Sequence, residues 1–138
     1  MLSTARESIR DKTVLVVDDS KMIRVTTQKS LLKAGFDVVL ATDGLDALSK
    51  IVESRPSLII LDIMMPEIDG YETCSLIKQH RDFSDIPVIM LSGKNSRFDQ
   101  SRSKLAGFDQ CLTKPFSEHS LISAINQVSA VEQVAAMN

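Results

Sequence analysis

Residues 58–66 read LIILDIMMP, and this stretch decides the fold. The four aliphatic residues at 58–61 are too few for a helix core and are typical of a strand buried on both faces. The run ends on Asp62, and an unpaired aspartate is costly to bury. Pro66 and the pair Asp69-Gly70 indicate that a loop follows. We therefore expect a central strand that delivers one carboxylate to a cleft, although this stretch alone leaves open that Asp62 only caps the loop.

The composition fits a single domain with a good core, since 43% of the 138 residues are hydrophobic. The net charge of -2 gives no electrostatic reason to expect nucleic acid or an acidic membrane surface as a partner. No apolar run approaches the ~20 residues of a membrane span. Cys74 and Cys111 sit in apolar patterns, which favours buried free thiols in a reducing cytosol. His80 and His119 are isolated, so we expect no zinc site.

The pattern along the chain predicts five strands that alternate with five helices. We divide the chain into an N-terminal arm at 1–11, one domain at 12–129 and a C-terminal tail at 130–138. The expected strands are 13–17, 36–41, 58–62, 88–91 and 110–113. The expected helices are 20–34, one that begins at Asp43-Gly44 and breaks at Arg55-Pro56, one that carries Tyr71, Cys74 and Ile77, a short one that carries Phe98, Ser101 and Leu105 before Gly107, and one capped by Ser117.

This alternation implies an α/β fold with a parallel sheet and helices on both of its faces. In such sheets, sites lie at the carboxyl ends of the strands. Four of the five expected strands end in polar groups, which are Asp18-Asp19, Asp62, Ser92 and Lys114. The convergence of these side chains at one edge is the strongest functional signal in the sequence.

Three acids at one edge of the sheet need a counter-charge. Two carboxylates about 4 Å apart repel each other by roughly 4 kcal/mol at an effective dielectric near 20. Dense oxygen ligands favour a hard cation such as Mg²⁺ or Mn²⁺, and Lys114 balances part of the charge. A phosphoryl group could bind there, with the Ser92 hydroxyl as a donor. Asp62 is the candidate nucleophile because it stands alone on the central strand, whereas Asp18 and Asp19 are better placed as metal ligands.

With these residues in place, the sequence resembles the receiver domain of bacterial two-component response regulators. The resemblance covers about residues 12–128 and rests on VLVVDDS at 14–20, LDIMMP at 61–66 with Asp69-Gly70, LS at 91–92 and LTKPF at 112–116. It implies a flavodoxin-like, doubly wound (βα)5 fold whose five-stranded parallel sheet has the order 2-1-3-4-5. It also implies that a histidine kinase or phosphotransfer domain phosphorylates Asp62 in the cytoplasm. Such a protein is a phosphoacceptor that participates in its own phosphorylation and dephosphorylation, and it is not an enzyme in the usual sense.

The resemblance also implies a role for each polar residue at the strand ends. Ser92 and Lys114 would contact the phosphoryl group, and the peptide bond between Lys114 and Pro115 would be cis, which is a permitted but uncommon state. Asp19, Asp62 and the Met64 backbone carbonyl would bind the metal directly. Asp18 would bind it mostly through water.

Within the family, the sequence looks like a stand-alone regulator of the CheY type, without an output domain, and is most similar to PilG-type regulators. These act with chemotaxis-like kinases that control type IV pili and twitching. The resemblance implies a downstream protein that binds the face of the fourth helix, fifth strand and fifth helix. Two positions depart from the family, since Cys111 replaces the usual aromatic residue and Met64 is apolar. We therefore expect the loop at 93–98 to carry the signal instead of an aromatic switch.

Other classes of protein fit the residues less well. A haloacid-dehalogenase-like phosphatase needs a second aspartate two positions after its nucleophile, where this chain has Met64. A flavin-binding module needs a loop rich in Ser, Thr or Gly after the first strand, but Asp18-Asp19 would repel a phosphate. A degenerate receiver that serves only as an interaction module is disfavoured because every site residue is present. Length and charge disfavour a DNA-binding regulator.

Overall fold

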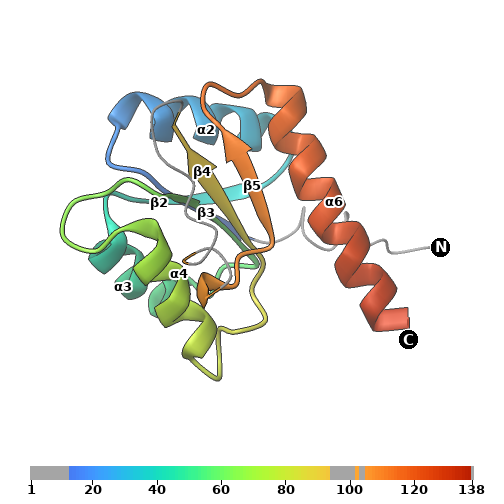
Figure 1. Cartoon of the computed structure of the whole chain (residues 1–138). Helices are drawn as coiled ribbons and strands as arrows, with labels where there is room; N and C mark the ends of the chain where they lie inside the picture. Colours follow the sequence, from blue (N-terminus) through green and yellow to red (C-terminus); the bar gives the residue numbers. More distant parts are fainter. Residues whose placement is uncertain (1–12, 94–101, 103–104, 138) are drawn as a thin grey trace.

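The computed structural model describes residues 13–93, 102 and 105–137, and side chains only as far as residue 128. Its five strands form one parallel sheet in the order β2-β1-β3-β4-β5 (Figure 1). The strands are β1 (Thr13–Val17), β2 (Asp37–Ala41), β3 (Leu58–Asp62), β4 (Val88–Ser92) and β5 (Gln110–Thr113). Figure 1 labels the helices α2 (Lys21–Lys33), α3 (Gly44–Ser54), α4 (Gly70–Gln79) and α6 (Glu118–Met137). This arrangement confirms the flavodoxin-like fold expected from the sequence.

The sheet lies between two layers of helices, with α3 and α4 on one face and α2 and α6 on the other (Figure 1). Successive side chains of a strand point to opposite faces. In β1, for example, Leu15 packs in the cluster with Ala47 of α3, whereas Val16 packs in the cluster with Leu121 of α6. Both faces of the sheet are therefore apolar, which explains the unbroken aliphatic runs in the sequence.

Strand β3 is the central strand, because β1 pairs with one of its edges and β4 with the other. All five of its residues are buried, including Asp62. The parallel register places Asp62 beside Leu91 of β4, next to Ser92 at the end of that strand. Since parallel strands end at the same edge of a sheet, this register gathers the polar residues that follow β1, β3, β4 and β5.

Short polar side chains cap the helices at the positions that the sequence predicts. The Asp43 carboxylate accepts a hydrogen bond from the Asp46 amide at 2.8 Å at the start of α3. The Ser117 hydroxyl accepts one from the Ser120 amide at 3.0 Å before α6. Such caps satisfy backbone N–H groups that have no partner within the helix. At the other end of α3, Arg55 takes the left-handed conformation with φ 47° and so ends the helix before Pro56.

Two expected segments lie largely outside the described residues. These are the N-terminal arm at 1–11 and the short helix at 98–107, within which the backbone of Arg102, Leu105 and Ala106 is helical. Leu105 is 82% exposed and Ala106 is buried, so the core contact of this segment is one position later than the expected stripe. Helix α6 continues to Met137, and the division at 129 stays a prediction.

The cysteines and histidines differ in how well the sequence predicted their environments. Both cysteines are free, and Cys74 is buried, but Cys111 is only half-buried, so the expectation for Cys111 was wrong. The physical reason is that β5 is an edge strand with a neighbour on one side alone. His80 and His119 are exposed, as expected. Among the described residues, no helix is both long and apolar enough to cross a membrane.

Candidate phosphoacceptor and metal site

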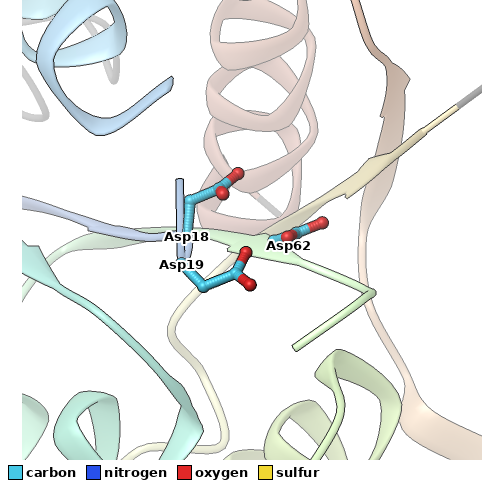
Figure 2. A group of neighbouring side chains, drawn as sticks. All are labelled: Asp18, Asp19 and Asp62. Carbon is cyan, nitrogen blue, oxygen red and sulfur yellow. The ribbon is translucent and has the colours of Figure 1, made fainter. Parts of the chain in front are cut away.

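Three carboxylates meet at the carboxyl edge of the sheet. Asp18 and Asp19 follow β1 directly, and Asp62 is the last residue of β3. One oxygen from each lies within 4.8 Å of the others, and Figure 2 shows the three side chains near one another at the ends of β1 and β3. Asp18 and Asp62 are buried, with exposed fractions of 0% and 2%, whereas Asp19 is exposed. The sequence therefore predicted this cluster correctly, down to the strands that carry it.

Lys114 supplies the positive charge inside the cluster. Its Nζ lies 2.8 Å from Asp18 Oδ2 and 3.2 Å from Asp62 Oδ1, and its side chain is 19% exposed. Burial by itself would lower the pKa of Lys114, but the contact with Asp18 and the charges of Asp62 and Asp18 outweigh it and raise the pKa. The peptide bond from Lys114 to Pro115 is cis, as the resemblance implied. Lys114 is therefore a firmly charged ammonium group that bridges two buried acids.

The lysine does not fully compensate Asp62. Burial and, to a smaller degree, the charge of Asp18 raise the pKa of Asp62 from its ordinary value of 3.8 to about 6. The nearby Lys114 and the Met64 amide, which donates to Asp62 Oδ1 at 3.3 Å, act in the opposite direction. A carboxylate with this pKa is mostly ionised at pH 7 and still basic enough to act as a nucleophile.

The carboxylate oxygens of the cluster are suitable ligands for a hard cation. Asp18 Oδ1 accepts a hydrogen bond from the Ser20 amide at 2.9 Å. Asp18 Oδ2 is fully buried and has its ion pair with Lys114, but no described group donates a well-aligned hydrogen bond to it. The exposed Asp19 opens the cluster to solvent, so that an ion can enter from that side. Carboxylate oxygens gathered in this way are the ligands that Mg²⁺ and Mn²⁺ favour.

Ser92, at the end of β4, and Met64, in the loop after β3, lie next to the acids. Ser92 is buried at the end of β4, and its carbonyl accepts the Lys114 amide hydrogen bond at 2.7 Å. This backbone contact keeps the end of β4 next to the lysine. Met64 is 62% exposed, and its amide contacts Asp62. The structure thus brings the predicted residues into one neighbourhood.

Sequence reasoning missed two residues that shape this site. Arg24 in α2 donates a hydrogen bond from Nη1 to the Asp18 carbonyl at 2.7 Å, which secures the turn that carries the acids. Gly70 begins α4 against the end of β3, and a Cβ atom there would fall on the Asp62 carbonyl and only 2.7 Å from Ile63 Cα. The sequence marked Gly70 as a turn residue, but no local pattern indicates that two backbones approach so closely.

The sequence matches the response regulator receiver domain over residues 14–126, and the chain belongs to this family. In particular, it is 53% identical to protein PilG of Pseudomonas aeruginosa over 112 residues, which cover 81% of this chain and 83% of that protein. It is 36% identical to the alkaline phosphatase synthesis transcriptional regulatory protein PhoP of Bacillus subtilis over 91% of this chain, but it spans only 52% of PhoP. Among solved structures, the chemotaxis protein CheY4 of Vibrio cholerae matches with a TM-score of 0.79 and 33% identity, over 84% of this chain and 97% of that one.

Membership of this family confirms the resemblance seen in the sequence. The chain is a receiver of the kind found in phosphorelay response regulators, which are signalling proteins whose partners are histidine kinases or phosphotransfer domains. The family binds Mg²⁺ at an acidic pocket, and the cluster of Asp18, Asp19 and Asp62 has that character. The haloacid-dehalogenase-like alternative receives no support.

Proposed function

We propose that this chain signals by accepting a phosphoryl group on Asp62 and then binding a downstream protein. One observation carries the proposal, which is the pairing of a buried Asp62 with the Lys114 ammonium at 3.2 Å beside Asp18 and Asp19. A structural ion pair would need one acid for one lysine. A second buried acid and a third exposed one are costly to gather unless the site binds further positive charge.

The transfer that we propose needs a carboxylate nucleophile and stabilisation of the phosphoryl oxygens. An ionised Asp62 oxygen attacks phosphorus, a P–O bond forms, and the P–N bond to the donor histidine breaks as its nitrogen takes up a proton. Lys114 moves from its contact with Asp62 to the phosphoryl oxygens, and the Ser92 hydroxyl donates to another of them. These roles make the chain a participant in its own phosphorylation and dephosphorylation.

We assign the metal to the acids at the same edge. Asp19, Asp62 and the Met64 carbonyl would hold Mg²⁺ or Mn²⁺ directly, with Asp18 acting mostly through water. When bound, the ion neutralises charge on the phosphoryl oxygens. The raised pKa of Asp62 supports this assignment, and so does the gathering of three carboxylates around a single lysine, because both indicate negative charge that Lys114 does not fully compensate.

The assignment of Asp62 is tested by intact-mass spectrometry after incubation with a small phosphodonor and Mg²⁺. The parent chain should gain one phosphoryl group, and Asp62→Asn should gain none. The exposed Asp82→Asn is the matched control and should behave as the parent does. If Asp62→Asn gains phosphate as readily as the parent, the nucleophile is another residue. Omission of the divalent ion should abolish the reaction in both the parent and the control.

For the pathway, we propose a chemotaxis-like system that controls type IV pili and twitching, in the cytoplasm. The support is the 53% identity to PilG and the presence of two free cysteines, which suit a reducing compartment. Capture of partners from a lysate of the source cells should be compared between protein with and without a beryllofluoride phosphoryl mimic. A pilus-linked partner that binds in one state alone supports the pathway, and a mimic-dependent DNA-binding or flagellar partner contradicts it.

We propose that the downstream protein binds the face formed by residues 98–107, β5 and α6. Cys111 in β5 packs against the apolar cluster but has no ring with which to follow a movement of Ser92. The signal would then pass through the loop at 93–98, most of which lies outside the described residues. Gly93 at its start permits the backbone to rearrange.

A further inference from the structure

Arg102 lies in the chain between β4 and β5, and its guanidinium contacts the start of α4. Its Nη2 lies 2.6 Å from Asp69 Oδ2, and its Cζ lies 4.8 Å from the centre of the Tyr71 ring. The Glu72 carboxylate is 3.9 Å from the same nitrogen. A charge-assisted hydrogen bond and a cation over an aromatic ring are both favourable contacts. One side chain therefore connects two segments that are 33 residues apart in the sequence.

Asp69 is well placed to pass this contact on to the site. One of its oxygens caps α4 by accepting the Glu72 amide at 2.9 Å, which leaves the other oxygen for Arg102. The next residue, Gly70, donates its amide hydrogen bond to the Ile63 carbonyl at 2.8 Å and sits against the Asp62 backbone. A displacement of Asp69 would therefore move the chain that follows the phosphoacceptor.

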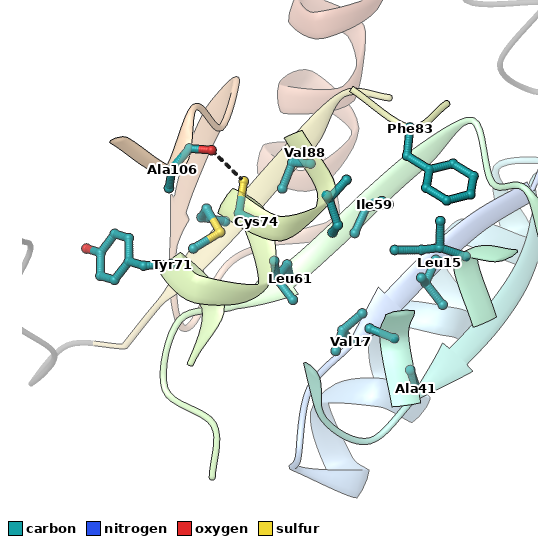
Figure 3. Close-up of a cluster of buried hydrophobic side chains, with 14 of the residues drawn as sticks. Leu15, Val17, Ala41, Ile59, Leu61, Tyr71, Cys74, Phe83, Val88 and Ala106 are labelled. Carbon is teal, nitrogen blue, oxygen red and sulfur yellow. Dashed lines mark hydrogen bonds between the residues drawn. The ribbon is translucent and has the colours of Figure 1, made fainter. Parts of the chain in front are cut away.

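Apolar packing alone does not hold these two segments together at this end. A hollow of about 330 Å³ lies between them, and Leu76 and Leu105 on its walls are 48% and 82% exposed. Deeper in, Ala106 is buried, and its carbonyl accepts a hydrogen bond from Cys74 Sγ at 3.3 Å (Figure 3). Ala106 is thus an anchor in the core, whereas Arg102, with a side chain 42% exposed, makes a polar contact that water can replace.

We infer that Arg102 is a positioning residue that couples the chain after Ser92 to the loop after Asp62. It holds Asp69 and Tyr71, and through them it fixes the start of α4 and the backbone beside the phosphoacceptor. Arg102 lies in the chain that follows Ser92, and its contact secures the acid loop without an aromatic ring from β5. The inference rests on the proposed function of Asp62.

The chain contains one tyrosine and no tryptophan, so its tyrosine fluorescence reports on Tyr71 alone. We would compare the parent with Arg102→Met, which keeps length but removes charge, and with Arg102→Lys, which keeps charge but not the fork of the guanidinium. Lys33→Met is the matched control, because it breaks another inter-helix ion pair, 3.7 Å from Glu118. Calorimetric titration of Mg²⁺ in the presence of beryllofluoride measures the affinity of the site.

Arg102→Met should alter the Tyr71 emission and weaken Mg²⁺ binding by roughly 2- to 30-fold, which is the range for residues that affect a site without touching its ligand. The Mg²⁺ affinity and Tyr71 emission of Arg102→Lys should fall between those of the parent and of Arg102→Met. Lys33→Met should match the parent in both. Asp69→Asn, which can still cap α4, should add no further loss to Arg102→Met. Unchanged emission and affinity in Arg102→Met, or additive losses in the double variant, would overturn the inference. A parent chain that binds neither Mg²⁺ nor beryllofluoride would instead contradict the proposed function.

Discussion

Replacement of Asp62 by asparagine should stabilise the metal-free protein, although it should abolish phosphorylation. Burial and the charge of Asp18 raise the pKa of Asp62 from 3.8 to about 6, despite the opposing effect of Lys114. Each pKa unit corresponds to 1.36 kcal/mol, so ionised Asp62 costs the folded state about 3 kcal/mol. This cost already includes the favourable contact with Lys114, and the buried asparagine amide must find hydrogen-bond partners of its own. We therefore expect a net gain in the free energy of unfolding of about 1 to 3 kcal/mol above pH 7.

The sign of the pH dependence follows from proton binding. The pKa of Asp62 is raised in the folded state, so between pH 3.8 and about 6 the folded state binds more protons than the unfolded state. The contribution of Asp62 to stability therefore falls as the pH rises through this window, and the full cost is present above it. The advantage of Asp62→Asn over the parent should thus be largest at pH 8 and vanish near pH 4.

Urea denaturation at pH 4, 6 and 8 in a buffer with a chelator measures this difference. The midpoint and slope give the free energy of unfolding at each pH. Asp82→Asn, on an exposed residue far from the acids in sequence, is the control and should differ little from the parent at any pH. If the difference between Asp62→Asn and the parent is the same at pH 4 and pH 8, burial of the ionised Asp62 carboxylate does not destabilise the folded state.

Three further predictions concern the metal, the loop and the signal. Mg²⁺ at 100 times its dissociation constant should stabilise the parent by roughly 2.7 kcal/mol, Asp19→Ala should lose this effect and Asp18→Ala should lose less; a melting temperature that ignores millimolar Mg²⁺ in the parent contradicts the metal site. Gly70→Ala should lower the free energy of unfolding by roughly 1 to 3 kcal/mol, because its Cβ would meet the Asp62 carbonyl; urea denaturation measures this, and an unchanged midpoint argues against the close contact. Cys111→Tyr should leave the response to beryllofluoride nearly intact, with amide shifts concentrated at 92–98 by NMR; shifts that are absent there, or partner binding that depends on phosphate only with the tyrosine, would refute transmission by the loop.

The sequence by itself determined the layout of the fold and the residues at its edge. Aliphatic runs such as 58–61 mark buried strands because a parallel sheet covered on both faces leaves no polar position. A polar residue that ends such a run is expected at the edge of the sheet, which is why Asp62 and Ser92 could be placed there before the structure was known. The short helix caps at Asp43 and Ser117 were predictable for a similar reason, since they depend on neighbours three residues away.

The tertiary structure alone decided which groups touch. Lys114 bridges Asp18 and Asp62 because the register of the strands brings their ends together. The half-burial of Cys111 depends on the position of β5 at the edge of the sheet. The contact of Arg102 with Asp69 depends on the packing of two segments that are 33 residues apart in the sequence. Periodicity in a sequence reports how far each residue is buried, but contacts between distant residues depend on register and packing, which no local pattern encodes.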